Sequence, residues 1–312
     1  MTHVVCGVDV SSTGLDARIG RSGAFAHFAN GPEGIEALAA FCRKHEVALA
    51  VLEATGGYEK QPFALLWSHG VPAAIVNPRA VRNFAQAMGW LEKTDRIDAG
   101  VIAWFAEAKG VEPMPPARDL QARLAALVTR LRQLTELKTA QSNQRRLVSE
   151  PIALASFDEL LALVARQIRA LETQIAELIE ADPLWRALDK TFRSIKGVAN
   201  RTVARLMAEL PEIGLIQNKA AAKLTGLAPL ACDSGNFAGR RAIRGGRAGV
   251  RATLFVVAEI VRRYDPDFAE FHRRLTLEGK PKKVVRVALA HKLLVRLNAK
   301  ARDARAALNA PA

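Results

Sequence analysis

The first third of the chain alternates short apolar runs with stretches of helical periodicity. The apolar runs predict strands at 3–10, 15–19, 24–28, 47–53 and 73–76. Helical spacing follows at 33–45 and 59–69, and Asn77-Pro78 opens a further helix because proline suits a first helical turn. Three meandering strands followed by alternating strands and helices are the order expected of a ribonuclease-H-like layer.

The middle of the chain is helical, and prolines at 113, 115 and 116 mark where it begins. Apolar residues recur with four-three spacing over 120–134 and again over 157–178, on either side of an interruption at 149–151. Such a heptad seam predicts a helical coiled-coil connector. The seam fits a hairpin that packs on itself and a pairing with another chain equally well.

The last part, from residue 183, is mainly helical. Gly197 precedes a helical run to Leu210, which fits a tight turn that presents backbone N–H groups to phosphate, or an ordinary packing unit. The predicted fold class is therefore α/β plus all-α. The predicted domains are a ribonuclease-H-like domain (1–112), a helical coiled-coil connector (113–182) and a mainly helical C-terminal domain (183–312).

Charge adds a partner to this picture. The 312 residues include 45 Lys and Arg against 31 Asp and Glu, a formal net charge of +14. Most of the surplus lies after residue 185, in clusters such as 240–247 and 280–286, which favours a nucleic acid as partner. The three cysteines have neither zinc spacing nor a disulfide pattern, which favours a reducing cytoplasm. No signal peptide and no run long enough to span a bilayer is visible, so we expect no membrane partner.

Four carboxylates fall where a metal-dependent nuclease would need them. Asp9 and Glu53 each close an apolar strand. Asp95 and Asp98 stand three apart, on one face of a helix that Thr94 would cap. Converging carboxylates repel one another without a cation. Their oxygens predict Mg²⁺, and two such ions can clamp the attacking and leaving oxygens of a phosphodiester.

Asp9 also has a competing interpretation. The segment 9–14, with the sequence DVSSTG after a strand, looks like the phosphate hairpin of actin-like sugar kinases. That class needs a second phosphate loop of similar form, which the sequence lacks. It also gives the basic C-terminal third no role, so it remains a minority interpretation.

A second candidate site lies near Ser234, between Asp233 and Gly235. A serine in this setting is most often part of a turn. The run 239–247 that follows is rich in glycine and arginine, and arginine binds phosphate in fork geometry. Arginines and Mg²⁺ would provide the charge stabilisation that a serine nucleophile needs. On spacing alone, the turn remains the stronger interpretation.

Together these motifs resemble the DEDD-type transposases of bacterial insertion sequences, in the insertion-sequence family numbered one hundred and ten. The resemblance is carried by GVDVS at 7–11, EATGGY at 53–58, NP at 77–78, KTDRIDA at 93–99, LTGLAP at 224–229, DSG at 233–235 and the Arg/Gly run. It spans nearly the whole chain and keeps the order of the motifs. One departure is Ala199, where the family's helix-hairpin-helix turn usually has a second glycine.

The resemblance implies a RuvC-like nuclease domain, a coiled-coil connector and a C-terminal transposase domain. It implies that Asp9, Glu53, Asp95 and Asp98 are catalytic Mg²⁺ ligands and that Ser234 is the nucleophile that joins DNA covalently. It further implies a structured noncoding bridge RNA that pairs with donor and target DNA. Finally, it implies homodimers and tetramers whose active site combines the nuclease domain of one subunit with the transposase domain of another.

The predicted function is therefore a DNA transposase or site-specific recombinase that acts through a phosphoserine–DNA intermediate. Two alternatives stay open: a junction-resolving nuclease that uses metal-activated water, and a non-catalytic nucleic-acid-binding protein. The predicted nucleic-acid-binding residues are Lys196, Arg240, Arg241, Arg244, Arg247 and Arg251.

Overall fold

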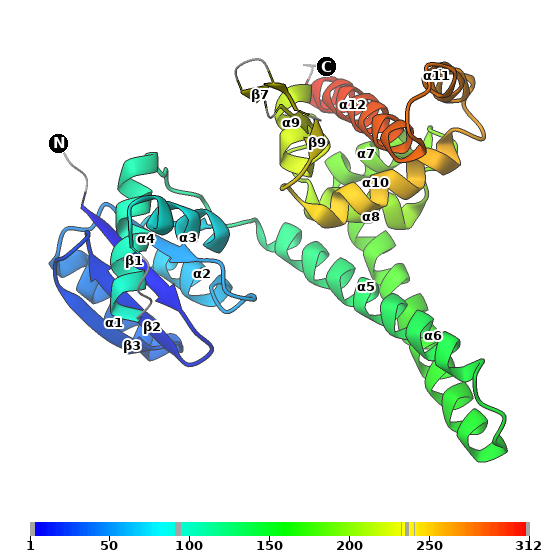
Figure 1. Ribbon diagram of the computed structural model, residues 1–312. Helices are drawn as coiled ribbons and strands as arrows, with labels where there is room; N and C mark the ends of the chain where they lie inside the picture. Colours follow the sequence, from blue (N-terminus) through cyan, green and yellow to red (C-terminus); the bar gives the residue numbers. More distant parts are fainter. Residues whose placement is uncertain (1–3, 91–94, 232, 235–236, 240, 310–312) are drawn as a thin grey trace. The chain divides into compact units, whose positions relative to one another are not determined.

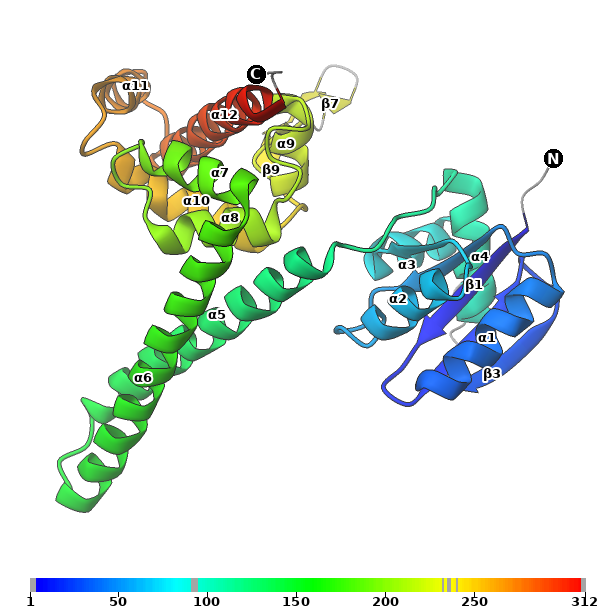
Figure 2. The same cartoon turned by 180° about the vertical axis from the view of Figure 1, so that it is seen from behind.

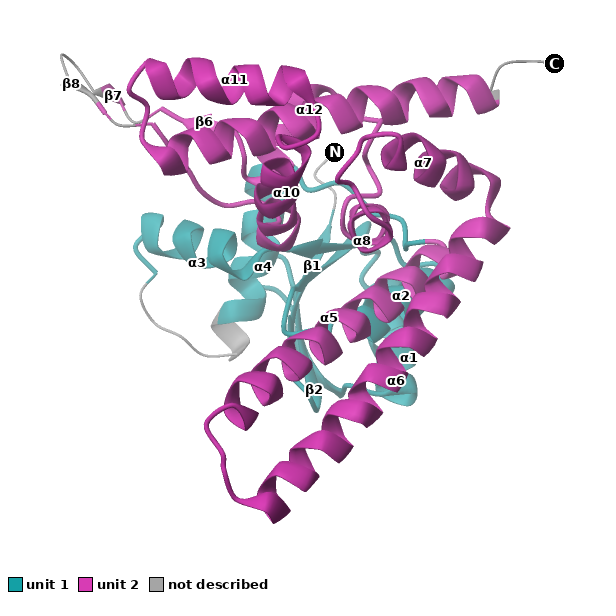
Figure 3. Cartoon of the chain, turned by 90° about the vertical axis from the view of Figure 1, so that its right-hand side faces the viewer, with its two compact units in different colours: residues 1–117 teal, residues 118–312 magenta. Residues whose placement is uncertain are grey.

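The structure is a computed structural model that describes residues 4–90, 95–231, 233–234, 237–239 and 241–309. The chain forms two compact units, Met1–Ala117 and Arg118–Ala312 (Figure 3). None of the described helices combines the length and the apolar composition that a bilayer span requires.

The first unit is built on one five-stranded sheet in the order β3-β2-β1-β4-β5. Its strands are β1 (Val5–Val10), β2 (Gly14–Ile19), β3 (Phe25–Ala29), β4 (Leu49–Glu53) and β5 (Ala73–Val76). The first three strands form an antiparallel meander, and β4 and β5 run parallel to β1. All five predicted strands are confirmed, with ends that differ by at most two residues.

Helices cover both faces of this sheet (Figure 1; Figure 2). They are α1 (Pro32–Lys44), α2 (Lys60–Ser68), α3 (Pro78–Ala87) and α4 (Asp95–Lys109). As predicted, Asn77 begins α3, and its side-chain Oδ1 accepts a hydrogen bond of 2.9 Å from the Arg79 amide. The predicted cap at Thr94 lies outside the described residues.

Alternation along β1 separates two cores. Cys6, Val8 and Val10 pack in the core that holds the apolar faces of α1 and α2. The odd-numbered face, beginning with Val5, packs in the core formed with α3 and α4. In the first core Cys6 and Cys42 are both buried, and a hydrogen bond with Cys42, together with burial, raises the pKa of the Cys6 thiol well above its ordinary value.

The second unit is helical. Its longest elements, α5 (Asp119–Arg145) and α6 (Pro151–Ala181), form a hairpin that projects from the other helices of the unit (Figure 1). The remaining helices are α7 (Pro183–Arg193), α8 (Asn200–Glu209), α9 (Asn218–Thr225), α10 (Ala248–Val261), α11 (Pro266–Leu277) and α12 (Lys282–Asn309). One apolar core runs from the hairpin into α7, α8, α10 and α12, so the predicted connector shares a compact unit with the C-terminal helices.

The heptad seam is filled within the hairpin. Its buried residues are Leu124, Val128, Leu131 and Leu134 on α5 and Val164, Ile168, Ile175 and Leu178 on α6. Of the two predicted arrangements, the structure contains the hairpin that packs on itself. Pairing of the hairpin with another chain stays a prediction.

Candidate functional site

Asp9 and Glu53 are neighbours at one edge of the sheet. β1 and β4 pair in parallel with Val8 opposite Leu52, and the two carboxylates follow these residues directly. Because side chains alternate along a strand, Asp9 shares the face of Val5, and Glu53 shares the face of Val51. Both Val5 and Val51 pack in the core formed with α3 and α4, so both carboxylates belong to the face that α4 covers.

Helix α4 crosses this face in direct backbone contact with β1. A Cβ atom at Gly7 would lie 2.0 Å from the carbonyl oxygen of Ala99 and 2.6 Å from the backbone nitrogen of Ala103. Nearer the start of the strand, Val5 and Ala106 line the same hollow. α4 therefore runs antiparallel to β1, with its first turn toward the carboxyl edge.

This direction brings the first turn of α4 to the two strand carboxylates. The step from Gly7 to Asp9 covers about 6.6 Å of strand, which corresponds to about four residues of helix. Counting back from the contact with Ala99 reaches the turn that carries Asp95 and Asp98. The backbone thus brings together the four positions predicted from the sequence.

Their side chains are described only in part. Asp9, Glu53 and Asp98 are half-buried, and each has an interaction partner. The side chain of Asp95 lies outside the described residues. Among the side chains that are described, no group of three or more His, Cys, Asp or Glu residues is arranged to hold a metal ion. A four-carboxylate metal site therefore stays a prediction.

The loop that follows Glu53 is held by a buried acid. Glu59 is 7% exposed, and its Oε2 accepts hydrogen bonds of 2.9 Å from the amides of Thr55 and Gly57. Asn30 donates from Nδ2 to the carbonyl oxygen of Ser11 at 2.8 Å, which ties the loop before α1 to the β1–β2 turn. These contacts fix the backbone on both sides of the carboxyl edge.

The same sheet face continues across β2 and β3. Asp16 pairs with Asp9 across the antiparallel ladder, and His27 pairs with Asp16 on the next strand. His27 Nδ1 lies 2.9 Å from Asp16 Oδ1. Sequence reasoning missed both residues: β2 also carries Arg18, so Asp16 does not stand out, and only the strand register makes it a neighbour of His27.

Ser234 belongs to a β-ribbon in the second unit (Figure 1). The ribbon consists of β6 (Pro229–Leu230) paired with β9 (Ala242–Ile243) and β7 (Asp233–Ser234) paired with β8 (Phe237–Ala238). Ser234 ends β7 opposite Phe237, and its side chain lies outside the described residues. This position is compatible both with Ser234 as part of a turn and with Ser234 as a nucleophile.

The arginines near the ribbon divide into two groups. Arg247 makes two hydrogen bonds with Glu212, of 2.5 and 2.6 Å, and Arg251 donates to the carbonyl oxygen of Gly245. These two guanidinium groups thus hold the base of the ribbon. Arg241 lies 3.2 Å from Asp233 in an exposed pair, Arg244 is exposed, and Arg240 lies outside the described residues.

The ion pair between Arg247 and Glu212 changes the titration of the acid. Burial raises the pKa of Glu212, but the hydrogen bonds from Arg247 and from the backbone together lower it more. The net result is a pKa below the ordinary value of a glutamate. The predicted contact between Arg247 and phosphate therefore competes with an existing structural partner.

Lys196 is exposed in the turn between α7 and α8. Gly197 in this turn has φ of +101°, and a Cβ atom there would lie 3.0 Å from the backbone nitrogen of Val261. The predicted tight turn between two short helices is therefore present and packs against the end of α10. Phosphate binding by this turn stays a prediction.

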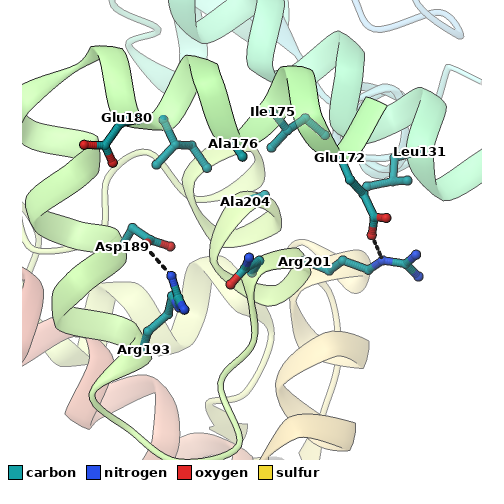
Figure 4. A pocket seen from close by; sticks show the side chains of 11 residues that line it. Leu131, Glu172, Ile175, Ala176, Glu180, Asp189, Arg193, Arg201 and Ala204 are labelled. Carbon is teal, nitrogen blue, oxygen red and sulfur yellow. Dashed lines mark hydrogen bonds and ion pairs between the residues drawn. The ribbon is translucent and has the colours of Figure 1, made fainter. Parts of the chain in front are cut away.

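A pocket of about 380 Å³ opens where α6 meets α7 and α8 (Figure 4). Each charged side chain that lines it is in an ion pair: Arg201 with Glu172 at 2.5 Å, Arg193 with Asp189 at 3.3 Å, and Glu180 with Arg186 at 3.5 Å. Because these charges satisfy each other, we regard the pocket as a packing hollow and not as part of the site.

Comparison with known proteins gives one consistent family. Residues 3–148 match the DEDD family of IS110 transposases, and residues 189–273 match the "Transposase IS116/IS110/IS902 family". The pilin gene-inverting protein of Moraxella lacunata is 27% identical over 313 residues, with 94% of each chain covered. The IS110 uncharacterized 43.6 kDa protein of Streptomyces coelicolor is 30% identical over 220 residues, with 67% of this chain and 53% of the relative covered.

Among solved structures, T. thermophilus RuvC in complex with a Holliday junction substrate is 16% identical. The match covers 36% of this chain and 99% of RuvC, with a TM-score of 0.27. A score of this size establishes no common fold.

Proposed function

We propose a mechanism for a chain that belongs to the IS110 family of transposases and is thus a DNA-recombining enzyme. In this proposal the first unit cuts DNA with the help of Mg²⁺, and Ser234 carries the cut strand covalently. The observation that supports this most is the convergence of Asp9, Glu53 and the first turn of α4 at one edge of the sheet. The strand order β3-β2-β1-β4-β5 supports a ribonuclease-H-like, RuvC-like assignment for this unit.

The residues at this edge fit a magnesium site by their chemistry. Mg²⁺ prefers carboxylate oxygens, and Asp9 and Glu53 are adjacent carboxylates that repel each other unless a cation lies between them. Asp9, Glu53, Asp95 and Asp98 would hold the ions. When bound, Mg²⁺ supplies Lewis-acid stabilisation of the phosphodiester oxygens. The chain's own contribution is the rigid edge, fixed by the close contact at Gly7 and by the Glu59 hydrogen bonds.

In the proposed strand transfer, the Oγ atom of Ser234 attacks the phosphorus. A P–Oγ bond forms as the bond to the departing deoxyribose oxygen breaks, and the serine proton passes, overall, to that oxygen. One ester is exchanged for another, so rejoining needs no ATP. Arg244, which is exposed, and Arg241, which is paired with Asp233, would bind the phosphate charge.

The resemblance supplies the remaining parts of the proposal: a bridge RNA that pairs with donor and target DNA, and an oligomer that combines units from different subunits. The name of the Moraxella relative, a pilin gene-inverting protein, supports an exchange of DNA strands over cutting alone. The surplus of Lys and Arg supports a nucleic acid as partner.

The experiment incubates the protein with Mg²⁺, RNA transcribed from the flanks of its element and DNA carrying the element ends. We expect a protein–DNA adduct that survives denaturation. Ser234→Ala should lose the adduct and keep nucleic-acid binding, and Asp9→Asn should lose strand cleavage. Matched controls are Ser194→Ala, in a turn of the same unit, and Glu107→Gln, an exposed acid near the far end of α4; both should act as wild type.

The same experiment separates the alternatives. Free DNA ends without an adduct would indicate a junction-resolving nuclease that uses water. Binding without Mg²⁺-dependent chemistry would indicate a non-catalytic nucleic-acid-binding protein. Full recombination by Ser234→Ala would remove the nucleophile assignment.

A further inference from the structure

His27 and Asp16 form a pair that the proposed function does not use. Asp9 pairs with Asp16 and Asp16 pairs with His27, one strand further at each step, while Glu53, on the other side of Asp9, follows the last residue of β4 that pairs with β1. The exposures of the two side chains differ: His27 is 62% exposed and Asp16 is 17% exposed. The largely buried Asp16 thus holds the solvent-exposed imidazole of His27 beside the proposed nuclease site.

The imidazole is held on two sides. Its Nδ1 lies 2.9 Å from Asp16 Oδ1. Its Cε1 lies over Gly14, where a Cβ atom would approach it to 2.6 Å. With the ring fixed in this way, Nε2 is the remaining polar atom, and among the described residues no partner of Nε2 is present. A histidine whose one nitrogen is fixed by a carboxylate presents its other nitrogen in a defined direction.

We propose that His27 binds a backbone phosphate of the DNA strand that lies across the Asp9–Glu53 edge, with Asp16 and Gly14 as positioning residues. This inference rests on the proposed nuclease function of the first unit. Two strand spacings separate His27 from Asp9, about 10 Å between Cα atoms. That distance is too long for His27 to contact the phosphate that would be cut at Asp9, but it suits a neighbouring phosphate of the same DNA strand.

The charges in the contact agree with this assignment. In the proposed contact, the imidazole of His27 donates from Nδ1 to the Asp16 carboxylate and from Nε2 to a phosphate oxygen. Such a contact displaces a counterion from DNA. The slope of log affinity against log salt concentration measures that release, at about 0.9 per phosphate on duplex DNA.

The test measures binding of the full chain to a short fluorescein-labelled DNA duplex over a range of KCl concentrations. Ca²⁺ replaces Mg²⁺ so that the readout is binding and not turnover. We expect His27→Gln to weaken binding about tenfold and to reduce the salt slope by about 0.9. The matched control is His69→Gln, which should bind as wild type. His69 lies between α2 and β5, and β5 is at the other end of the strand order from β3.

The positioning residues make a sharper prediction. Asp16→Ala and Gly14→Ala should each reproduce the His27→Gln slope, and Asp16→Ala combined with His27→Gln should lose no more than either alone. Gly14→Ala displaces only the exposed end of the His27 side chain, so its thermal unfolding midpoint should stay close to wild type. His27→Lys should restore the slope in the Asp16→Ala protein, because a lysine needs no orienting partner.

Failure of the phosphate contact and failure of the proposed nuclease function give different results. A wild-type salt slope in His27→Gln overturns the phosphate contact, even if Asp9→Asn abolishes cleavage. Normal cleavage by Asp9→Asn overturns the nuclease edge, even if His27→Gln loses its slope. Additive losses in the Asp16 and His27 double variant would also overturn the pairing.

Discussion

At the scale of the residue, the geometry of the candidate edge depends on Gly7. Its backbone is in contact with α4, and any side chain there would overlap the carbonyl oxygen of Ala99. The same contact sets how far the turn with Asp95 and Asp98 stands from Asp9. A residue without chemical function of its own therefore determines the spacing of the residues that are proposed to have one.

Gly7→Ala should destabilise the first unit by about 3 kcal/mol, because overpacking at a rigid backbone contact forces α4 away from β1. It should also abolish cleavage while leaving all four carboxylates in the chain. Urea unfolding and the cleavage assay measure the two effects. Gly31→Ala is the matched control, since Gly31 has extended backbone and nothing within 4 Å of its would-be Cβ; equal behaviour of the two variants would contradict the packing argument.

The sequence predicts the strand-end acids but not their neighbours. Asp9 and Glu53 stand out because each closes an apolar run, and a carboxylate at a strand end needs an explanation. Asp16 and His27 become visible only with the register, which pairs residues 11 apart in the chain. Glu59 looks like an ordinary helix-start acid until the structure shows its hydrogen bonds to Thr55 and Gly57.

At the scale of the element, the ribbon is anchored by the start of α10. Arg247 precedes that helix and binds Glu212, in the loop after α8, as well as the carbonyl oxygen of Glu209. From the sequence, the arginine run reads as one phosphate-binding group. The structure divides these arginines into paired and exposed side chains. Local spacing could not predict this, because the partner of Arg247 lies far along the chain.

Arg247→Met should lower the free energy of unfolding by about 1–2 kcal/mol at neutral pH, because the ion pair is partly exposed. The folded pKa of Glu212 lies below its ordinary value, so the pair stabilises the fold at neutral pH and loses this effect as the pH falls through the folded pKa. The difference between variant and wild type should therefore shrink in acid. Arg273→Met, in an exposed pair with Glu270, should leave stability unchanged; an equal loss there would contradict the assignment.

At the scale of the whole molecule, the chain consists of two compact units. The sheet unit buries its apolar residues within residues 5–106, and the helical unit buries its own within residues 124–301. The division between the two units falls after Ala117, next to the prolines at 113, 115 and 116. The three-part division predicted from periodicity remains a functional description that the packing does not test.

Calorimetry of the full chain should show two unfolding transitions, since each unit buries its apolar residues among themselves. Gly7→Ala should lower only one transition. Leu124→Ala, at a fully buried position of the hairpin seam, should lower the other, with a cost of about 2–5 kcal/mol. A single transition that both variants shift equally would show that the units unfold together.

The antiparallel course of α4 has an electrostatic consequence. Aligned peptide dipoles give the amino end of a helix a partial positive charge of about half a unit, and the amino end of α4 lies at the edge where Asp9 and Glu53 meet. The helix therefore offsets part of the repulsion between these acids before any cation binds. The same field attracts a phosphodiester, so it also offsets part of the repulsion between DNA and the acidic side chains.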